Sequence, residues 1–448
     1  MTASRPNKQL TKNVLSLTIV QIASYVLPLI SVPVVSRIIG PGKYGILNFA
    51  AAYIMYFILL VSYSFDFTAT RKIARDPNNE QYRSIVFSEV FYTQCLLFVF
   101  STLVFAALLY TVPELKTNKT VFIFTYFTCV ATLFTQNWLF QAMQDLSKIA
   151  LFNLISKLLF TVAILVVVRK NDDYIWQPFI IGVIQIVVSV WCLIWAFRKY
   201  RIKFVKVPIA RCINVMLEER VVFFSLVFVN LYTSTNTVIL GLYQNTEQVG
   251  YYTAAQRLII VAQSVLVMPF AQAFYPFAGK AFGEGREKGL RVVQKMVPLL
   301  IAFLGLASMI MLVLGPLVIR IFYGHKFEPA IPVFEILAIV PLVFSLSNVL
   351  GIQIMMNLGM DKLYFKITAS AGILSVLLNL LTVKHWGYMG STINWLVTEI
   401  FLLIAMYIML RRKGLSPINF EYFRSSVVRE YLQLMKKMLL AKISKNVI

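Results

Sequence analysis

The sequence predicts an all-α polytopic membrane protein of about 12 transmembrane helices, in two six-helix lobes around a central cavity. The chain has 448 residues, of which 59% are hydrophobic and only 14% are charged, and its mean hydropathy is +0.76. A soluble protein needs far more polar side chains on its surface, so lipid is the expected solvent. The longest polar stretch between apolar runs lies near the middle, at residues 198–219, which predicts the division into halves.

The individual spans follow from the lengths of the apolar runs. A helix needs roughly 20 apolar residues to cross a hydrocarbon layer about 30 Å thick. Helices are expected because unpaired backbone groups are very costly in lipid. The runs that qualify lie approximately at residues 13–39, 45–65, 85–110, 120–141, 149–168, 177–197, 221–243, 251–274, 292–319, 331–357, 363–383 and 388–410.

Positive charge predicts the orientation. The net charge is +23, and Lys and Arg concentrate in alternate loops, such as residues 71–83 and 198–211. With a cytoplasmic N-terminus these loops lie inside, as the positive-inside rule requires, and both termini are then cytoplasmic. Because the basic residues lie between apolar runs, anionic lipid headgroups are the expected partners, and nucleic acid is not.

The predicted domains are an N-terminal lobe at 1–197, a basic cytoplasmic linker at 198–219, a C-terminal lobe at 220–410 and a cytoplasmic tail at 411–448. Faint kinship between the halves appears when Gly45 is set against Gly250. Both halves cross the membrane in the same direction, so the expected repeat axis runs along the membrane normal. In the tail, apolar and basic residues alternate at helical spacing over residues 422–445, which predicts an amphipathic helix on the anionic inner leaflet.

Three cations lie within or at the ends of apolar runs and are candidates for binding an anionic substrate. Arg257 lies about two turns into its run, roughly 10 Å from the outer end. Lys157 lies near the middle of the fifth run and Arg37 near the outer end of the first. A cation at depth is costly unless it faces a wet cavity or a partner. The alternative for each is an interfacial anchor whose charged end reaches the headgroups.

Three carboxylates are candidates for ion coupling: Glu399 in the middle of the twelfth run, and Asp66 and Glu89 at the inner ends of the second and third. A carboxyl desolvated between helices can take up and release a proton during a transport cycle. Alternatively, Glu399 pairs with a buried cation.

No enzyme chemistry is expected. The four cysteines have no CxxC spacing and the two histidines, His325 and His385, are far apart, so neither a metal nor a disulfide framework is predicted. Phosphate-cradling Gly-rich loops, a Walker motif and a Ser-His-Asp arrangement are not found, which argues against ATP hydrolysis and nucleophilic catalysis.

Four short motifs resemble one transporter superfamily. They are SRIIG at 36–40 followed by Tyr44-Gly45, VGYYTAAQRL at 249–258, FEPAIP at 327–332, and WGYMGS at 386–391. In this order they resemble the oligosaccharide flippases of the MATE-like superfamily of multidrug, oligosaccharidyl-lipid and polysaccharide exporters. Arg257 also matches an arginine that lipid II flippases place near the pyrophosphate, whereas their counterpart in the second span is replaced by Ala52.

The resemblance implies a flippase of the bacterial inner membrane. It would move undecaprenyl-diphosphate-linked repeat units of O-antigen, capsule or exopolysaccharide to the periplasmic leaflet by alternating access. It implies no cofactor beyond a coupling proton or sodium ion, and a glycan polymerase or glycosyltransferases as protein partners. A multidrug or cation antiporter on the same scaffold is the first alternative, and Arg257 and Lys157 argue against a cationic cargo. A membrane glycan polymerase or ligase is the second, and the short outer loops argue against it.

Overall fold

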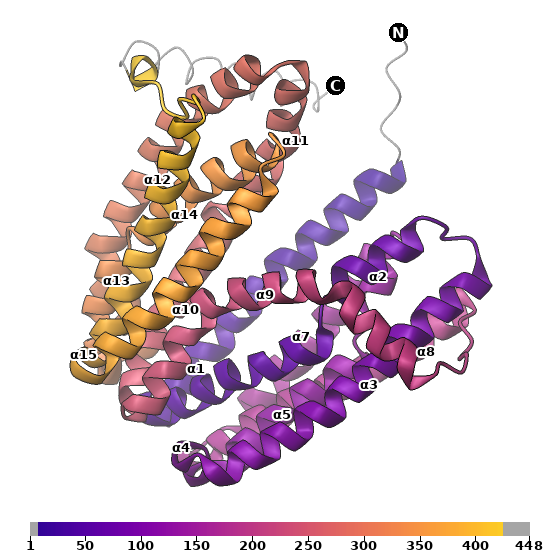
Figure 1. Cartoon of the computed structure of the whole chain (residues 1–448). Coiled ribbons are helices and arrows are strands. Elements are labelled where there is room, and N and C mark those ends of the chain that lie inside the picture. The colour runs from indigo at the N-terminus through magenta and orange to yellow at the C-terminus, as the bar shows by residue number, and fades with distance from the viewer. Residues whose placement is uncertain (1–7, 424–448) are drawn as a thin grey trace. The chain divides into compact units, whose positions relative to one another are not determined.

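The computed structural model describes residues 8–423, and these fold into helices joined by short loops, with no strand among them (Figure 1). In chain order the helices are α1 (Lys8–Ser62), α2 (Phe65–Ala74), α3 (Glu80–Thr111), α4 (Pro113–Thr117), α5 (Lys119–Phe134), α6 (Asn137–Ala142), α7 (Leu146–Val167), η1 (Asn171–Ile175), α8 (Trp176–Tyr200), α9 (Ile209–Tyr243), α10 (Thr246–Leu266), α11 (Met268–Glu284), α12 (Arg286–Tyr323), η2 (His325–Ala330), α13 (Ile331–Leu337), α14 (Val340–Asn348), η3 (Val349–Met356), α15 (Asp361–Arg412) and η4 (Phe420–Phe423). Most of the predicted amphipathic tail helix lies outside the described residues.

The helices are of membrane-crossing size, which confirms the all-α polytopic class. Eight helical stretches of the described chain are long and apolar enough to span a bilayer. Helix α15 has 52 residues and would be about 78 Å long if straight, which is more than one crossing needs. It breaks at Gly387, where φ is +54°, and α1 breaks in the same way at Gly40, where φ is +74°. Both breaks fall between predicted spans, while the exact count of twelve stays a prediction.

The chain forms two compact units that are not simple sequence halves. The first combines the described residues up to Ala254 with Leu317–Ala330 and Val376–Ser391. The second contains Ala255–Pro316, Ile331–Ser375 and the described residues from Thr392 onward. The predicted division into two lobes and a linker stays a prediction. Helix α9 begins at Ile209, inside the segment predicted as the linker.

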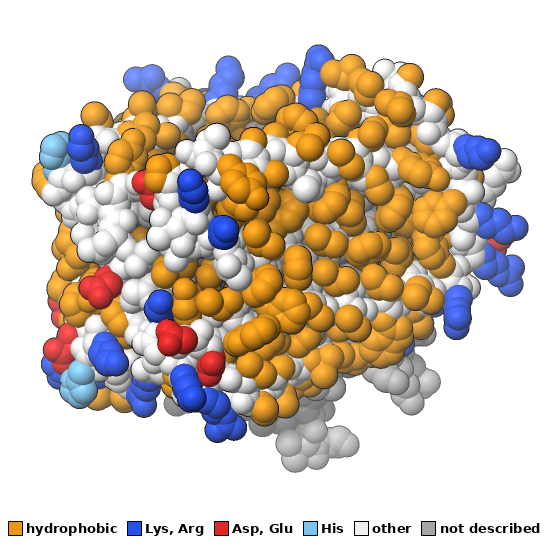
Figure 2. Space-filling view, turned by 90° about the horizontal axis from the view of Figure 1, so that it is seen from below, with side chains coloured by type: hydrophobic (Ala, Val, Ile, Leu, Met, Phe, Trp, Pro, Cys, Tyr) orange, Lys and Arg blue, Asp and Glu red, His pale blue; other side chains and the backbone are white. Residues whose placement is uncertain are grey.

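The outer surface of the helices suits lipid. Large apolar side chains are strongly exposed on several helices, for example Leu103, Val162, Val313 and Leu381. Figure 2 shows hydrophobic side chains gathered over a broad zone of one face, with Lys and Arg side chains beyond its margins. Contiguous apolar surface of this kind is unusual on a soluble monomer and normal where lipid tails are the solvent.

A core of large side chains in the first unit holds α2, α3, α6 and α8 together. Phe87, Trp138 and Phe140 are almost fully buried in it. Helix α5 stops at Phe134, and the buried Gln136 joins the break to α3, because its Nε2 donates to Gln94 Oε1 at 2.9 Å. Gln136 Oε1 accepts the indole N–H of Trp138. This network fixes the end of α5 and the start of α6, which form part of the site described below.

Arg83 fastens the start of α3 to the end of α8. Its side chain is 4% exposed, Nε donates to Tyr200 O at 3.1 Å, and Nη1 donates to Pro77 O at 2.7 Å. Tyr200 is the last residue of α8, where carbonyls lack helical partners and the helix dipole favours a cation.

We expect Arg83→Met to destabilise the protein, because Met keeps most of the apolar volume but leaves two carbonyls without donors. The cost should be about 1–3 kcal/mol, measured as a lower thermal unfolding midpoint in detergent. Arg71→Met is the control, since Arg71 is exposed on α2. Equal midpoints for the two variants would show that the buried guanidinium does not stabilise the fold.

Candidate functional site

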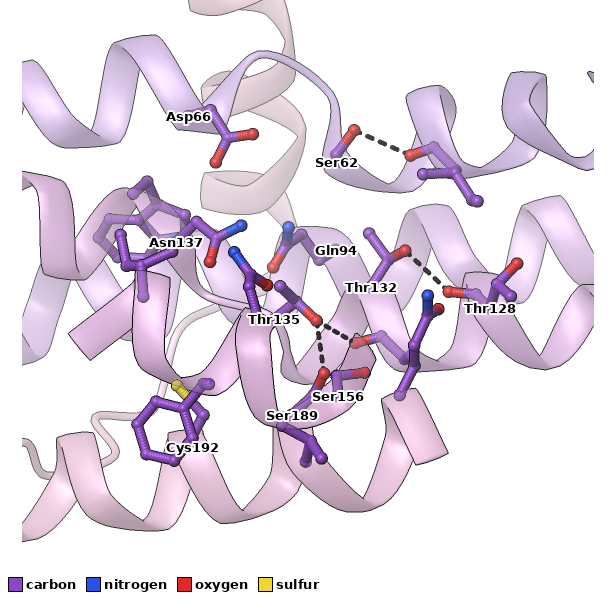
Figure 3. Close-up of a pocket in the computed structure, with 18 of the residues that line it drawn as sticks. Ser62, Asp66, Gln94, Thr128, Thr132, Thr135, Asn137, Ser156, Ser189 and Cys192 are labelled. Carbon is purple, nitrogen blue, oxygen red and sulfur yellow. Dashed lines mark hydrogen bonds between the residues drawn. The ribbon is translucent and has the colours of Figure 1, made fainter. Parts of the chain in front are cut away.

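A polar pocket of about 430 Å³ lies inside the first unit, and α1, α3, α7 and α8, which contribute to it, belong to stretches long and apolar enough to span a bilayer. Helices α1, α2, α3, α5, α6, α7 and α8 all contribute to its wall. Its apolar side includes Met55, Ile58, Phe152 and Val188. Its polar lining consists of Ser62, Asp66, Gln94, Thr128, Thr132, Thr135, Asn137, Asn153, Ser156, Lys157, Gln185 and Ser189 (Figure 3).

Two helix breaks create the polar character of the pocket. Helix α1 ends at Ser62, and Tyr63 adopts a left-handed conformation with φ +53° before α2 begins. This turn places Asp66 in the first turn of α2, where the helix dipole favours a carboxylate. Figure 3 shows the Asp66 side chain directed from this break toward Asn137 and Gln94. The second break, between α5 and α6, places Thr135 and Asn137 on the opposite wall.

The hydroxyl groups of the wall bond mainly to their own helices or to each other. Ser62 Oγ donates to Ile58 O at 2.8 Å, and Thr132 Oγ1 donates to Thr128 O at 3.0 Å. Thr135 Oγ1 and Ser189 Oγ lie 2.7 Å apart and join α5 to α8. A hydroxyl that donates to its own backbone keeps lone pairs for a ligand. Together with the side-chain amides, the wall therefore offers many donors and acceptors, as a polyhydroxylated ligand requires.

The structure brings two of the six predicted site residues into this pocket. Lys157 comes from α7 and Asp66 from α2, so a cation and a carboxylate line the same cavity. The sequence predicted separate roles for them: Lys157 was a candidate for binding an anionic group of the cargo, and Asp66 was a candidate for ion coupling. Those roles stay predictions, whereas the shared location is a property of the fold.

Glu89 lies elsewhere in the first unit, in an ion pair. Arg211 Nε lies 2.7 Å from Glu89 Oε1, and its Nη1 lies 2.9 Å from Glu218 Oε1. The hydrogen bond that Arg211 donates to the Glu89 carboxylate is the largest cause of the raised pKa of Arg211. These contacts fasten the start of α9 to α3, so the geometry favours a structural task for Glu89; its predicted part in ion coupling is not tested.

Arg37 contacts the end of α12 within the first unit. Its guanidinium donates to the backbone carbonyl of Ile321, and a second contact to Arg320 O is 3.4 Å long. Carbonyls in the last turn of a helix attract a cation. This arrangement gives Arg37 partners within the protein, and its predicted contact with the cargo stays a prediction.

The remaining two predicted residues belong to the second unit. Arg257 lies on α10 with an exposed side chain. Glu399 is 2% exposed on α15; the indole of Trp395 donates to its Oε1 at 3.4 Å, while its Oε2 has no hydrogen-bond partner within the described chain. The buried cation that was the alternative explanation for Glu399 is not found among the residues described.

Sequence reasoning missed most of the pocket wall, although a signal was present. Polar residues recur on one face of three apolar runs: Thr128, Thr132 and Thr135 on α5, Asn153, Ser156 and Lys157 on α7, and Gln185, Ser189 and Cys192 on α8. Such spacing of three, four or seven residues marks one side of a helix. Polar stripes within spans identify faces that do not point to lipid.

Comparisons with known proteins agree with this architecture. A family model described as "Polysaccharide biosynthesis protein" matches residues 10–282. A relative from Escherichia coli (strain K12) named "Putative O-antigen transporter" is 28% identical over 406 residues, covering 91% of this chain and 98% of the relative. A relative of the same name from Shigella dysenteriae is 26% identical over 397 residues, covering 88% and 98%.

Solved structures confirm the MATE-like fold. The lipid II flippase MurJ in an inward closed conformation superposes with a TM-score of 0.73 at 13% identity, covering 95% of this chain and 92% of that one. An inward-facing multidrug resistance MATE family transporter of the MOP superfamily gives a TM-score of 0.64 at 13% identity, covering 88% and 97%.

Proposed function

The chain belongs to the polysaccharide biosynthesis protein family, and from this we propose that it is a flippase, not an enzyme, that moves undecaprenyl-diphosphate-linked oligosaccharides from the cytoplasmic to the periplasmic leaflet. Repeat units of O-antigen, capsule or exopolysaccharide are the proposed cargo. The names of its relatives and its likeness to lipid II flippases support this proposal.

The polar pocket of the first unit is the observation that carries the proposal. A sugar head cannot cross hydrocarbon without replacing its bonds to water, because each unpaired polar group costs several kcal/mol. The hydroxyl and amide groups of the pocket can replace these bonds, and Lys157 can attract a phosphate or uronic acid. The prenyl tail needs no such site, since it can stay in lipid throughout.

Transport against a concentration gradient requires an energy source, and we propose proton coupling through Glu399. Its buried carboxyl forms no ion pair within residues 8–423, and a desolvated carboxyl without a cation is the kind of group that can carry a proton through a transport cycle. Asp66 is a second candidate for ion coupling. Because its carboxyl lines the proposed cargo pocket, an ion bound there would lie beside the cargo.

The location proposed is the bacterial inner membrane, with both termini in the cytoplasm. Glycosyltransferases or a glycan polymerase are the proposed protein partners, because the cargo is made on one side and consumed on the other.

A deletion strain tests the function. Loss of the chain should remove the surface glycan and cause lipid-linked repeat units to accumulate in the cytoplasmic leaflet, and a plasmid copy should reverse both effects. Lipid extraction with mass spectrometry measures accumulation, and surface glycan staining measures export. Normal surface glycan together with increased drug sensitivity would instead identify the multidrug antiporter alternative.

A further inference from the structure

An apolar groove of about 280 Å³ lies in the second unit, on helices that do not contribute to the polar pocket. Val297 of α12 and Val349 and Leu350 of η3 line it and are almost fully buried, so they form its floor. Ile404 of α15 also lines the groove but is 51% exposed, so it marks the opening. The groove is therefore accessible from the surface of the second unit.

The composition of the groove suits a hydrocarbon chain. Tyr407 supplies the one hydroxyl among the described side chains that line it, and the others are Val, Leu or Ile. A sugar would find almost no hydrogen-bond partner there, whereas a dry apolar cavity of about 150 Å³ can bind benzene. All three walls belong to stretches long and apolar enough to span a bilayer, so lipid acyl chains surround the opening.

Polar and charged groups lie directly beyond one end of the groove. Arg411 is exposed one turn after Tyr407 on the same face of α15, and its Nη1 donates to Ser416 Oγ at 2.6 Å. The backbone carbonyl of Ser416 accepts from Gln294 Nε2 of α12. This short segment therefore joins α12 to α15 at the end of the groove, and Ile418 continues from it into the groove wall.

The surroundings of this end are strongly cationic. Residues 284–295 and 411–423 carry seven basic and three acidic residues. Two of the acids are held by basic residues of α12, in ion pairs of 3.9 and 3.8 Å. In the predicted orientation this end faces the cytoplasm, where anionic headgroups attract Lys and Arg. An apolar groove that ends at a cationic rim is complementary to a hydrocarbon chain that ends in a phosphate.

We infer that the groove binds an anionic phospholipid of the cytoplasmic leaflet, with one acyl chain against Val349 and Leu350 and the headgroup phosphate at Arg411. The bound lipid connects α12, η3 and α15 and stabilises the second unit. Because the headgroup contact is ionic, the site selects phosphatidylglycerol over phosphatidylethanolamine, whose headgroup has no net charge. The inference concerns a resident lipid and not the cargo, so it does not depend on the proposed function.

Native mass spectrometry of the purified full chain in detergent tests the acyl-chain site, with the two phospholipids as probes. Ile404→Trp puts a larger side chain in the opening and should weaken binding of both lipids about tenfold, the effect of displacing about two methylene groups. Ile408→Trp is the matched control, since Ile408 is also exposed on α15 but lies outside the set that lines the groove, and it should bind as the wild type. An equal effect of the two tryptophans would show non-specific surface lipid and overturn the inference.

The headgroup contact is tested separately. The wild type should bind phosphatidylglycerol about tenfold more tightly than phosphatidylethanolamine, and Arg411→Gln should remove this difference. Arg412→Gln removes the same charge from an adjacent exposed position and should keep the difference. Phosphatidylglycerol should also raise the thermal unfolding midpoint of the wild type but not of Ile404→Trp, because a ligand stabilises the fold that binds it. No preference in the wild type, or equal preference in both Arg variants, contradicts the inference.

Two other occupants of the groove would give different results. If undecaprenyl phosphate binds the wild type more tightly than phosphatidylglycerol does, the groove takes a prenyl chain. If phosphatidylglycerol binds a chain that ends at Phe423 but not the full chain, residues 424–448 occupy the groove. Either result overturns the inference, whereas tighter binding of phosphatidylglycerol by the full chain supports it.

Discussion

Replacement of Lys157 by methionine is expected to reduce glycan export by about 10- to 100-fold while the protein still inserts and folds. Methionine fills similar space, so the main loss is the ammonium group in the polar pocket. A charge-assisted hydrogen bond is worth about 1.5–3 kcal/mol, which corresponds to this range. Export is measured as surface glycan formed per unit time in the deletion strain at matched protein levels.

Two further variants make the result specific. Lys157→Arg keeps the charge and should retain part of the export. Lys148→Met removes a lysine from the same helix, one whose ammonium lies 5.4 Å from the Trp195 ring and which does not line the pocket, and should export normally. If Lys157→Met exports glycan at the wild-type rate, the pocket does not bind the cargo, and this conclusion does not depend on the family of the protein.

The sequence was sufficient to predict the membrane class and the places where the chain turns. The length of an apolar run is enough to identify a span. At Gly40 and Gly387 the backbone leaves the helical conformation, with a positive φ that glycine adopts easily. The count of spans is harder to define, because helix breaks at Tyr63 and Thr135 lie within or near spans and not in polar loops.

The candidate site was only partly predictable, because it depends on contacts between distant residues. Lys157 and Asp66 are recognisable one at a time, but their shared cavity exists only after α2 packs on α6 and α7 packs on α1. Glu89 illustrates the opposite case. It looked isolated at the end of a span, yet its partner Arg211 lies 122 residues later, in the segment predicted as a linker. The position of a charged residue along a span therefore shows that its burial is costly, but it does not show which residue pairs with it.

The glycine pair shows how a weak sequence signal gains meaning from the fold. A faint internal repeat aligned Gly45 with Gly250, and the structure places these two residues at a reciprocal backbone contact. Two membrane helices can approach this closely only where their side chains are small, so the contact gives both glycines a structural reason that their alignment in the sequence did not supply.

Glu399→Gln is expected to uncouple export from the proton gradient. The wild-type carboxyl is buried and forms no ion pair in the part of the chain that the structure describes, and glutamine imitates its neutral form permanently. In the wild type, a protonophore should slow export because proton release and uptake accompany the cycle. In the variant, export should be at least tenfold slower, and the remainder should not respond to the protonophore. A variant with wild-type rate and wild-type response would place coupling at another residue.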